Sequence, residues 1–207
     1  GLGLKWLAIL FAVFGAFAAF GIGNMVQSNS VAAALQSSFG LNPWITGVVL
    51  AVITALVIVG GIKRIGAFTE KLVPFMAAVY ILGGLIIVLM NAAKIPAAFA
   101  LIFSSAFTGH AAVGGFVGAG LAQAIRFGIA RGVFTNEAGL GSSPIAHAAA
   151  TTDHPVRQGL WAVFEVFADT IVICSITALA IITSGVWEGG LSGAAITTAA
   201  FDASLPN

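Results

Sequence analysis

The chain has 207 residues, of which 59% are hydrophobic and only 7% are charged, whereas about 25% of residues are charged in an ordinary soluble domain. This composition predicts an all-α integral membrane protein, because a helix satisfies its own backbone hydrogen bonds within a bilayer. A formal net charge of +1 carries no information about nucleic acid, because the few charges act locally, and no nucleic-acid partner is expected. The single cysteine, Cys174, excludes a disulfide framework and a thiolate metal site.

Five apolar stretches reach the length of roughly 20 residues that a membrane-spanning helix needs. Turn residues such as Asn42-Pro43 and charged pairs such as Lys63-Arg64 separate them. The predicted spans are residues 6–38, 43–62, 72–91, 112–150 and 158–184. Residues 97–107 are too short to cross, so we expect an interfacial helix there, and we expect an extracellular loop at residues 185–207.

Basic residues in short loops predict the orientation, because they accumulate on the cytoplasmic side of a membrane. Lys94 falls on one side of the predicted spans. Five basic residues fall on the other side: Lys5, Lys63, Arg64, Lys71 and Arg157. This distribution places the beginning of the sequence in the cytoplasm and its end outside. Because the sequence begins inside a membrane segment, we expect residues 1–207 to be one transmembrane domain of a longer protein.

The first span carries a row of small residues at four-residue spacing: Gly15, Ala19 and Gly23. Gln27 continues this row. Since small residues at this spacing let helices pack closely in membranes, Gln27 is predicted to point into the bundle. Its amide both donates and accepts hydrogen bonds, which favours a role as a substrate ligand. For the neighbouring Asn24 and Ser28, interhelical hydrogen bonding and ligand binding are equally weighted interpretations.

Residues 131–144 interrupt the fourth span with an arginine, an asparagine, a glutamate, three hydroxyl side chains, a proline and three glycines. Polar backbone and ionisable groups occur at membrane depth only where protein or a water-lined cavity surrounds them. We therefore predict a discontinuous helix, broken between residues 131 and 136. A second half-helix would run from about Glu137 to Ala150, capped by Thr135 or Asn136. The alternative is a polar turn that only packs against its neighbours.

The two ends of a broken helix attract charged ligands, because the backbone dipoles leave partial charges there. Amide groups after Asn136 would bind a carboxylate, and carbonyl groups near Arg131 and Gly132 would bind a cation. Glycines at 132 and 139 allow a small ligand to approach the backbone closely. This reasoning selects four candidate substrate-binding residues in the interruption: Gly132, Thr135, Asn136 and Gly139.

Charged residues inside the predicted spans form a second candidate feature, because a lone charge at this depth is disfavoured. We expect Arg131 to pair with Glu165 or Asp169, which lie one turn apart on the fifth span. Glu137 belongs to the same predicted charge network. A structural and a mechanistic role for this network are equally weighted. His110 has no second ligand at helical spacing, so it gives little support for a metal site.

The motifs of common enzyme classes are absent from the sequence, including H-E-x-x-H, G-x-S-x-G, the P-loop and a complete G-x-G-x-x-G. We therefore do not expect an enzyme. A membrane channel is the competing class, but a channel favours a continuous polar lining rather than one broken helix.

Three segments together resemble the alanine or glycine:cation symporter family: GIGNMVQSN at residues 21–29, GIARGVFTNEAGLGS at 128–142 and WAVFEVFAD at 161–169. The resemblance runs through the whole sequence. It implies the five-plus-five inverted-repeat fold of LeuT-type transporters, of which these residues would form core helices three to five of the first repeat and the first two of the second. It also implies that Gln27 and Phe134 occupy substrate-contact positions.

By this resemblance, the protein takes up alanine or glycine across a bacterial or archaeal cytoplasmic membrane, with sodium as the coupling ion and no cofactor. Part of the sodium site is implied to lie outside these residues, whose own sodium ligands are therefore not assigned. The expected partners are the amino acid, sodium and the lipid bilayer. The alternatives are a carrier for another small neutral amino acid, which could be coupled to protons, and a gated channel.

Overall fold

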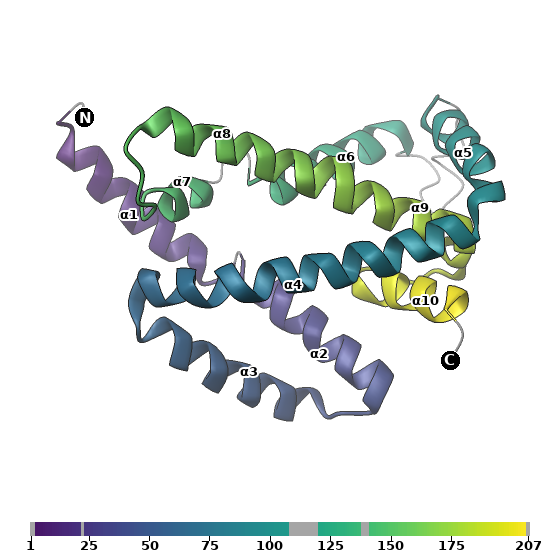
Figure 1. The fold of residues 1–207 in the computed structure, drawn as a ribbon, viewed down its shortest axis with the longest axis horizontal. Helices are drawn as coiled ribbons and strands as arrows, with labels where there is room; N and C mark the ends of the chain where they lie inside the picture. The colour runs from purple at the N-terminus through teal and green to yellow at the C-terminus, as the bar shows by residue number, and fades with distance from the viewer. Residues whose placement is uncertain (1–2, 22, 108–119, 138–140, 206–207) are drawn as a thin grey trace. The chain divides into compact units, whose positions relative to one another are not determined.

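The computed structural model describes the backbone of residues 3–21, 23–107, 120–137 and 141–205. Every regular element within these ranges is a helix (Figure 1). The all-α prediction is therefore confirmed for the described residues. The chain divides into two compact units, the first formed by residues 1–71 and 193–195 and the second by residues 72–192 and 196–207.

In the first unit, the predicted span 6–38 is wrong as a single helix. The structure has two helices here, α1 (Lys5–Ala19) and α2 (Met25–Phe39). Gly23 lies between them with a φ of 85°, a left-handed conformation that glycine adopts readily and other residues do not. The glycine that the spacing assigned to a packing face thus interrupts the helix.

The third helix, α3 (Pro43–Ile58), begins where the sequence predicts it. The side chain of Asn42 accepts a hydrogen bond from the backbone N–H of Trp44 at 2.9 Å, which caps the helix. Pro43 occupies the first helical position, where its missing N–H costs nothing. α3 packs against α2.

The loop expected between the second and third spans is also wrong, because α4 (Gly61–Met90) is one helix of 30 residues. Gly61, with a φ of 71°, provides the turn that precedes it. The charged residues of the expected loop, Lys63, Arg64, Glu70 and Lys71, all have high helix propensity, so they continue the helix once it has started. Pro74 lies inside α4.

Two helical segments of the described chain are long and apolar enough to cross a membrane, Gly61–Met90 and Pro155–Ser184. Each has 30 residues. Three further apolar helices are shorter: Lys5–Ala19, Pro43–Ile58 and Ala92–Ser105. Among the described residues, length and composition therefore select two spanning helices where the sequence predicts five spans.

The second unit continues from α4 through these elements: η1 (Ala92–Lys94), α5 (Ile95–Phe107), α6 (Gly120–Thr135), α7 (Ser142–His147), α8 (Pro155–Val166), η3 (Phe167–Ile173), α9 (Cys174–Ser184), η4 (Val186–Gly189) and α10 (Ala194–Ser204). α5 confirms the helix expected at residues 97–107, whose interfacial position stays a prediction. The loop expected at residues 185–207 is wrong, because its alanine-rich part forms α10.

The predicted fifth span is confirmed as a continuous helical segment, and Figure 1 shows α8 and α9 as one rod. Its middle part, η3, is a π-helix, in which each backbone hydrogen bond spans one residue more than in an α-helix. The sequence analysis does not predict this turn.

The core of the second unit lies where α4 meets α9 and α10. Ile87, Ala180 and Ala200 are almost completely buried. Gly84 lies so close to Ile176 that a Cβ atom on Gly84 would collide with that side chain. The hydroxyl of Tyr80 bonds to that of Thr177 at 2.5 Å. These contacts fix α9, and with it η3, on the scaffold.

Candidate functional site

The interruption of the fourth span lies later than the sequence predicts. α6 is helical through Thr135, and the backbone N–H of Asn136 still donates to the carbonyl of Gly132 at 3.1 Å. The predicted break between residues 131 and 136 is therefore wrong. A single glycine inside a helix is tolerated at a cost of about 1 kcal/mol, so Gly132 does not end α6. The irregular backbone begins instead at Glu137, the one non-glycine residue with positive φ (50°) in the described chain.

The half-helix after the interruption is shorter than predicted. α7 contains only Ser142–His147, rather than residues 137–150, and Gly141 precedes it with a φ of 81°. Neither Thr135 nor Asn136 caps it, because no side-chain hydrogen bond is formed at its N-cap. The helix start expected directly after Asn136 is thus absent from the described structure. Gly139 lies outside the described residues.

Asn136 is held by two contacts at the end of α6. Its Nδ2 donates to the carbonyl oxygen of Gly132 at 3.0 Å. Its Oδ1 accepts a hydrogen bond from Oγ1 of Thr170 at 2.5 Å. Both side chains are half-buried. The interruption is consequently connected to the π-helical turn η3, which also contacts α6.

Thr170 is the residue of this site that the sequence analysis misses. The available signal is a polar pair, Asp169-Thr170, within an otherwise apolar segment. The analysis used Asp169 for its charge and passed over the neighbouring hydroxyl. π-Helical turns inside α-helices frequently occur at functional sites, and here the turn carries the side chain that reaches the end of α6.

A second contact spans the interruption itself. Ser142, at the start of α7, donates from Oγ to Oε2 of Glu137 at 2.7 Å. Of the other candidate residues on α6, Phe134 is half-buried, whereas Gly132 and Thr135 are exposed in this structure. These residues therefore present an accessible surface beside the fixed amide of Asn136.

The ion pair expected for Arg131 is not formed within the described part of the chain. Arg131 is exposed, and the two ion pairs found join His147 to Glu165 and Arg157 to Asp153. Glu165 belongs to α8 and faces α7, where its Oε2 lies 3.4 Å from Nε2 of His147. Asp169 lies further on, inside η3. The predicted charge network is therefore replaced by a contact between α7 and α8.

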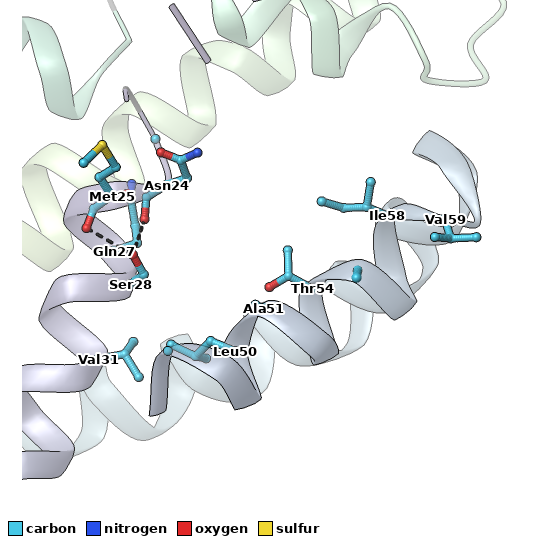
Figure 2. Close-up of a pocket in the computed structure, with 13 residues that line it drawn as sticks. Asn24, Met25, Gln27, Ser28, Val31, Leu50, Ala51, Thr54, Ile58 and Val59 are labelled. Atoms are coloured by element: carbon cyan, nitrogen blue, oxygen red, sulfur yellow. Dashed lines mark hydrogen bonds between the residues drawn. The ribbon is translucent and has the colours of Figure 1, made fainter. Parts of the chain in front are cut away.

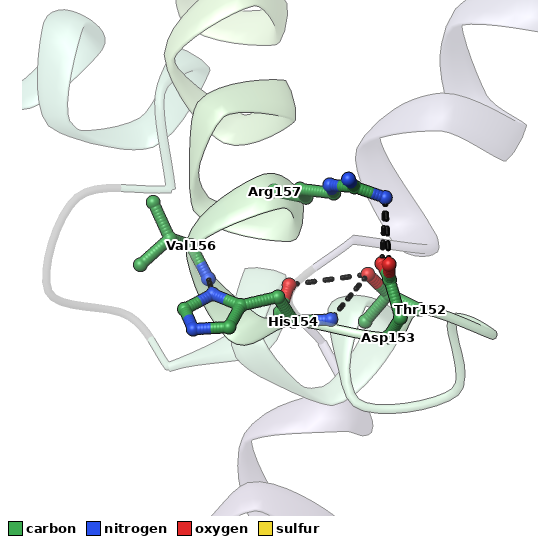
Figure 3. A network of polar contacts seen from close by, with 5 residues as sticks. All are labelled: Thr152, Asp153, His154, Val156 and Arg157. Atoms are coloured by element: carbon green, nitrogen blue, oxygen red, sulfur yellow. Dashed lines mark hydrogen bonds and ion pairs between the residues drawn. The ribbon is translucent and has the colours of Figure 1, made fainter.

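The connection from α7 to α8 is held by local polar contacts (Figure 3). Arg157 donates from one nitrogen to both carboxylate oxygens of Asp153, at 2.7 and 2.9 Å. Nδ1 of His154 accepts from the backbone N–H of Val156 at 3.2 Å and caps α8. A capped helix start and a pair at i,i+4 spacing both stabilise the first turn of a helix. This short connection thus fixes where α8 begins.

Gln27 lies in the first unit, where it borders an open cavity of about 880 Å³ between α2 and α3. In Figure 2, Asn24, Gln27 and Ser28 lie on the α2 side of the cavity, and Leu50, Thr54 and Ile58 on the α3 side. Phe134 and Asn136 belong to the second unit. The structure thus places the sequence-predicted substrate ligands in two separate units.

The polar side chains beside this cavity differ in their contacts. Ser28 donates to the backbone carbonyls of Asn24 and Met25, at 2.9 and 3.2 Å. Asn24 donates from Nδ2 to the carbonyl of Ala19 at 3.1 Å and so bridges the gap between α1 and α2. The side chain of Gln27, in contrast, makes no hydrogen bond to any other residue that the structure describes. Its amide is therefore available to a ligand.

In the described part of the chain, no three His, Cys, Asp or Glu side chains lie together, so these residues form no cluster that could hold a metal ion. Membrane carriers often bind their substrates at polar interruptions of apolar helices, and this chain has such an interruption after α6. The chain belongs to the sodium:alanine symporter family, whose model matches residues 1–207. It is accordingly part of a multi-pass membrane transporter, as the resemblance in the sequence implies.

Three relatives show the range of this similarity. The sodium/alanine symporter AgcS of Methanococcus maripaludis is 57% identical over 210 residues, which cover 100% of this chain and 45% of that protein. The putative sodium/proton-dependent alanine carrier protein YrbD of Bacillus subtilis is 42% identical over 220 residues, covering 100% of this chain and 45% of the relative. The probable sodium/glutamine symporter GlnT of Bacillus subtilis is 42% identical over 200 residues, covering 96% and 41%.

This chain therefore spans less than half the length of each of these relatives. The relatives are named as symporters and a carrier, so the chain is part of a transporter and not of an enzyme.

Proposed function

We propose that this chain is part of a symporter that uses a sodium gradient to take up alanine or glycine across the cytoplasmic membrane of a bacterium or archaeon. The observation that carries the proposal is the family match over all 207 residues, together with 57% identity to a protein named as a sodium/alanine symporter. Sodium acts as the coupling ion, and no cofactor is proposed. The complete transporter would have the five-plus-five inverted-repeat fold.

The end of α6 supports this proposal physically. The C-terminal carbonyl groups of a helix bear partial negative charge, which suits the ammonium group of an amino acid or a sodium ion. Gly132 and Thr135 lie at this end and are exposed, and Phe134 offers an aromatic surface to a small side chain. We propose that these residues, with Asn136 and Gly139, form one wall of the substrate site.

Gln27 is a separate candidate ligand, which lies within the first unit. Its amide has no protein partner among the described residues, and it borders the cavity between α2 and α3. A primary amide offers two donors and one acceptor oxygen, so it can bind either the carboxylate or the ammonium group of the substrate. A small site with both functions fits alanine or glycine.

Uptake by proteoliposomes that contain the full-length protein tests the proposal. Labelled alanine should accumulate when an inward sodium gradient is imposed, and unlabelled glycine should compete. Potassium in place of sodium is the matched control, and accumulation should then fall to the level of empty liposomes. Alanine uptake that is equal in both salts would rule out sodium coupling.

Two relatives favour particular alternatives, which the same assay separates. Similarity to a probable sodium/glutamine symporter makes glutamine the second candidate substrate, so glutamine should be included as a competitor. Similarity to a putative sodium/proton-dependent alanine carrier makes protons the second candidate coupling ion. A proton gradient without sodium should drive uptake only if this alternative is correct.

A further inference from the structure

Three threonines lie along the continuous helical segment Pro155–Ser184, and they use their hydroxyl groups differently. Thr177 donates to the carbonyl of Ile173, and Thr183 to that of Leu179, both at 2.7 Å and four residues earlier. This bond to the preceding turn is the usual one for threonine inside a helix. Thr170 instead donates to Oδ1 of Asn136, which lies 34 residues earlier in the chain.

The π-helical turn accounts for this difference. Thr170 lies in the middle of η3 (Phe167–Ile173). An extra residue in a turn alters the direction of the side chains, because each residue of a helix turns it by about 100°. Thr170 is thereby directed at the end of α6, and η3 and α6 are in contact.

The hydroxyl of Thr170 determines the orientation of the Asn136 amide. Oδ1 accepts from Thr170 at 2.5 Å, and Nδ2 donates to the carbonyl of Gly132 at 3.0 Å. Both ends of the amide are thus bonded. That carbonyl also accepts the backbone N–H of Asn136 at 3.1 Å. A rotated amide would turn Oδ1 toward the Gly132 carbonyl and place two acceptors together.

We propose that Thr170 is a positioning residue for substrate binding, which acts through Asn136 without touching the substrate. Its hydroxyl holds the amide of Asn136 in one orientation, and that amide in turn fixes the carbonyl of Gly132 in the last turn of α6. This inference rests on the proposed function, because it requires that the end of α6 binds the transported amino acid. Removal of the hydroxyl leaves Oδ1 without its donor and lets the amide rotate.

The test uses the full-length transporter and three variants, with the initial rate of sodium-driven alanine uptake measured per folded molecule. Thr170→Val removes the hydroxyl and keeps the shape, and we expect the KM for alanine to rise about two- to tenfold, the effect of one hydrogen bond. Thr170→Ser should restore the wild-type KM. Thr183→Val is the matched control, because it removes the same hydroxyl from the same segment and should leave KM unchanged.

Two further variants, Asn136→Ala alone and Asn136→Ala combined with Thr170→Val, test whether Thr170 acts through Asn136. In the Asn136→Ala background, Thr170→Val should raise KM no further. Equal KM values for Thr170→Val and Thr183→Val overturn the inference, and so does an additive effect in the Asn136→Ala background. If Thr170→Val does not fold, Thr170→Ala is measured against Thr170→Ser in its place.

The proposed function fails in a different way. Wild-type protein would then show no sodium-dependent alanine uptake. In that case the same five variants are compared for the amino acid that the wild type does transport, and the inference stands or falls on the same differences in KM.

Discussion

Nε2 of His147 lies 3.4 Å from Oε2 of Glu165, which joins the short helix α7 to α8. Nδ1 of the same ring lies 2.7 Å from Nε2 of Gln158. Because an amide nitrogen is a donor only, Nδ1 must accept, and the ring proton is on Nε2 and faces the carboxylate. The imidazole is thus bonded on both sides to α8, and it fixes the position of a helix of only six residues.

We expect a small but measurable coupling between His147 and Glu165. The Glu165 side chain is 67% exposed, and a hydrogen bond from a neutral imidazole to an exposed carboxylate should contribute no more than the about 0.2 to 1 kcal/mol of an exposed ion pair. A double-mutant cycle with His147→Ala and Glu165→Ala, measured by thermal unfolding of the full-length protein in detergent, should give a coupling energy in this range. The pair Asp153 and Arg157, both exposed and four residues apart at the start of α8, is the control and should also give about 0.2 to 1 kcal/mol. Strictly additive effects at 147 and 165 would contradict the contact.

Gly84 should be intolerant of a side chain. A Cβ atom at this position would collide with Ile176 of α9. Overpacking of a core typically costs about 1 to 3 kcal/mol, and we expect Gly84→Ala to lower the stability by this amount. Gly66→Ala is the control in the same helix, because a Cβ there meets nothing within 4 Å. Alanine in place of a helical glycine should then stabilise by roughly 0.5 to 1 kcal/mol. Thermal unfolding compares the two, and a neutral Gly84→Ala would show that α4 and α9 do not pack this closely.

Gln27 should affect substrate affinity more than stability. Loss of a hydrogen bond to a charged group costs about 1.5 to 3 kcal/mol, so Gln27→Leu should weaken alanine binding on the order of tenfold to a hundredfold. Gln36→Leu is the control, since Gln36 lies on the same helix and does not line the cavity. Isothermal calorimetry on the folded full-length protein measures both affinities. Unchanged affinity in Gln27→Leu would exclude Gln27 as a ligand.

The protein should be more stable with glycine at position 137 than with alanine there. Its φ of 50° is left-handed, a conformation that costs a residue with a Cβ atom roughly 1 to 2 kcal/mol. Both substitutions remove the carboxylate that accepts from Ser142, so their difference isolates the backbone. In thermal unfolding, the Glu137→Gly variant should therefore be more stable than the Glu137→Ala variant by about 1 kcal/mol. An alanine variant as stable as the glycine variant would argue against the left-handed backbone.

Composition and local polarity predict the helical class and the existence of the interruption, because both depend on the cost of polar groups in an apolar chain. They do not predict where the interruption begins. The sequence offers glycines at 132, 139 and 141 as turn residues. The structure uses Gly141 in this way and, four residues earlier, also places Glu137 in the left-handed conformation. Its contact to Ser142 stabilises that choice and cannot be read from residue types alone.

Other differences have separate physical causes. The charges between Lys63 and Lys71 indicate a loop by polarity, yet these residues favour helix, and the helical preference prevails in α4. The ion pair predicted for Arg131 is wrong, because Glu165 faces α7. That contact joins two separate segments of the chain, so residue types alone do not predict it. The role of Thr170 depends on a π-helical turn, for which hydrophobic periodicity gives no signal.

The π-helical turn makes the number of residues in its segment as important as their identity. Through Gln158 and Glu165, α8 faces α7, whereas α9 faces α4 through Ile176 and Thr177. The turn absorbs one extra residue, so a regular α-helix with the same number of residues in 167–173 would rotate one of these faces by about 100° relative to the other. The segment should therefore accept many apolar substitutions during evolution but almost no change in length.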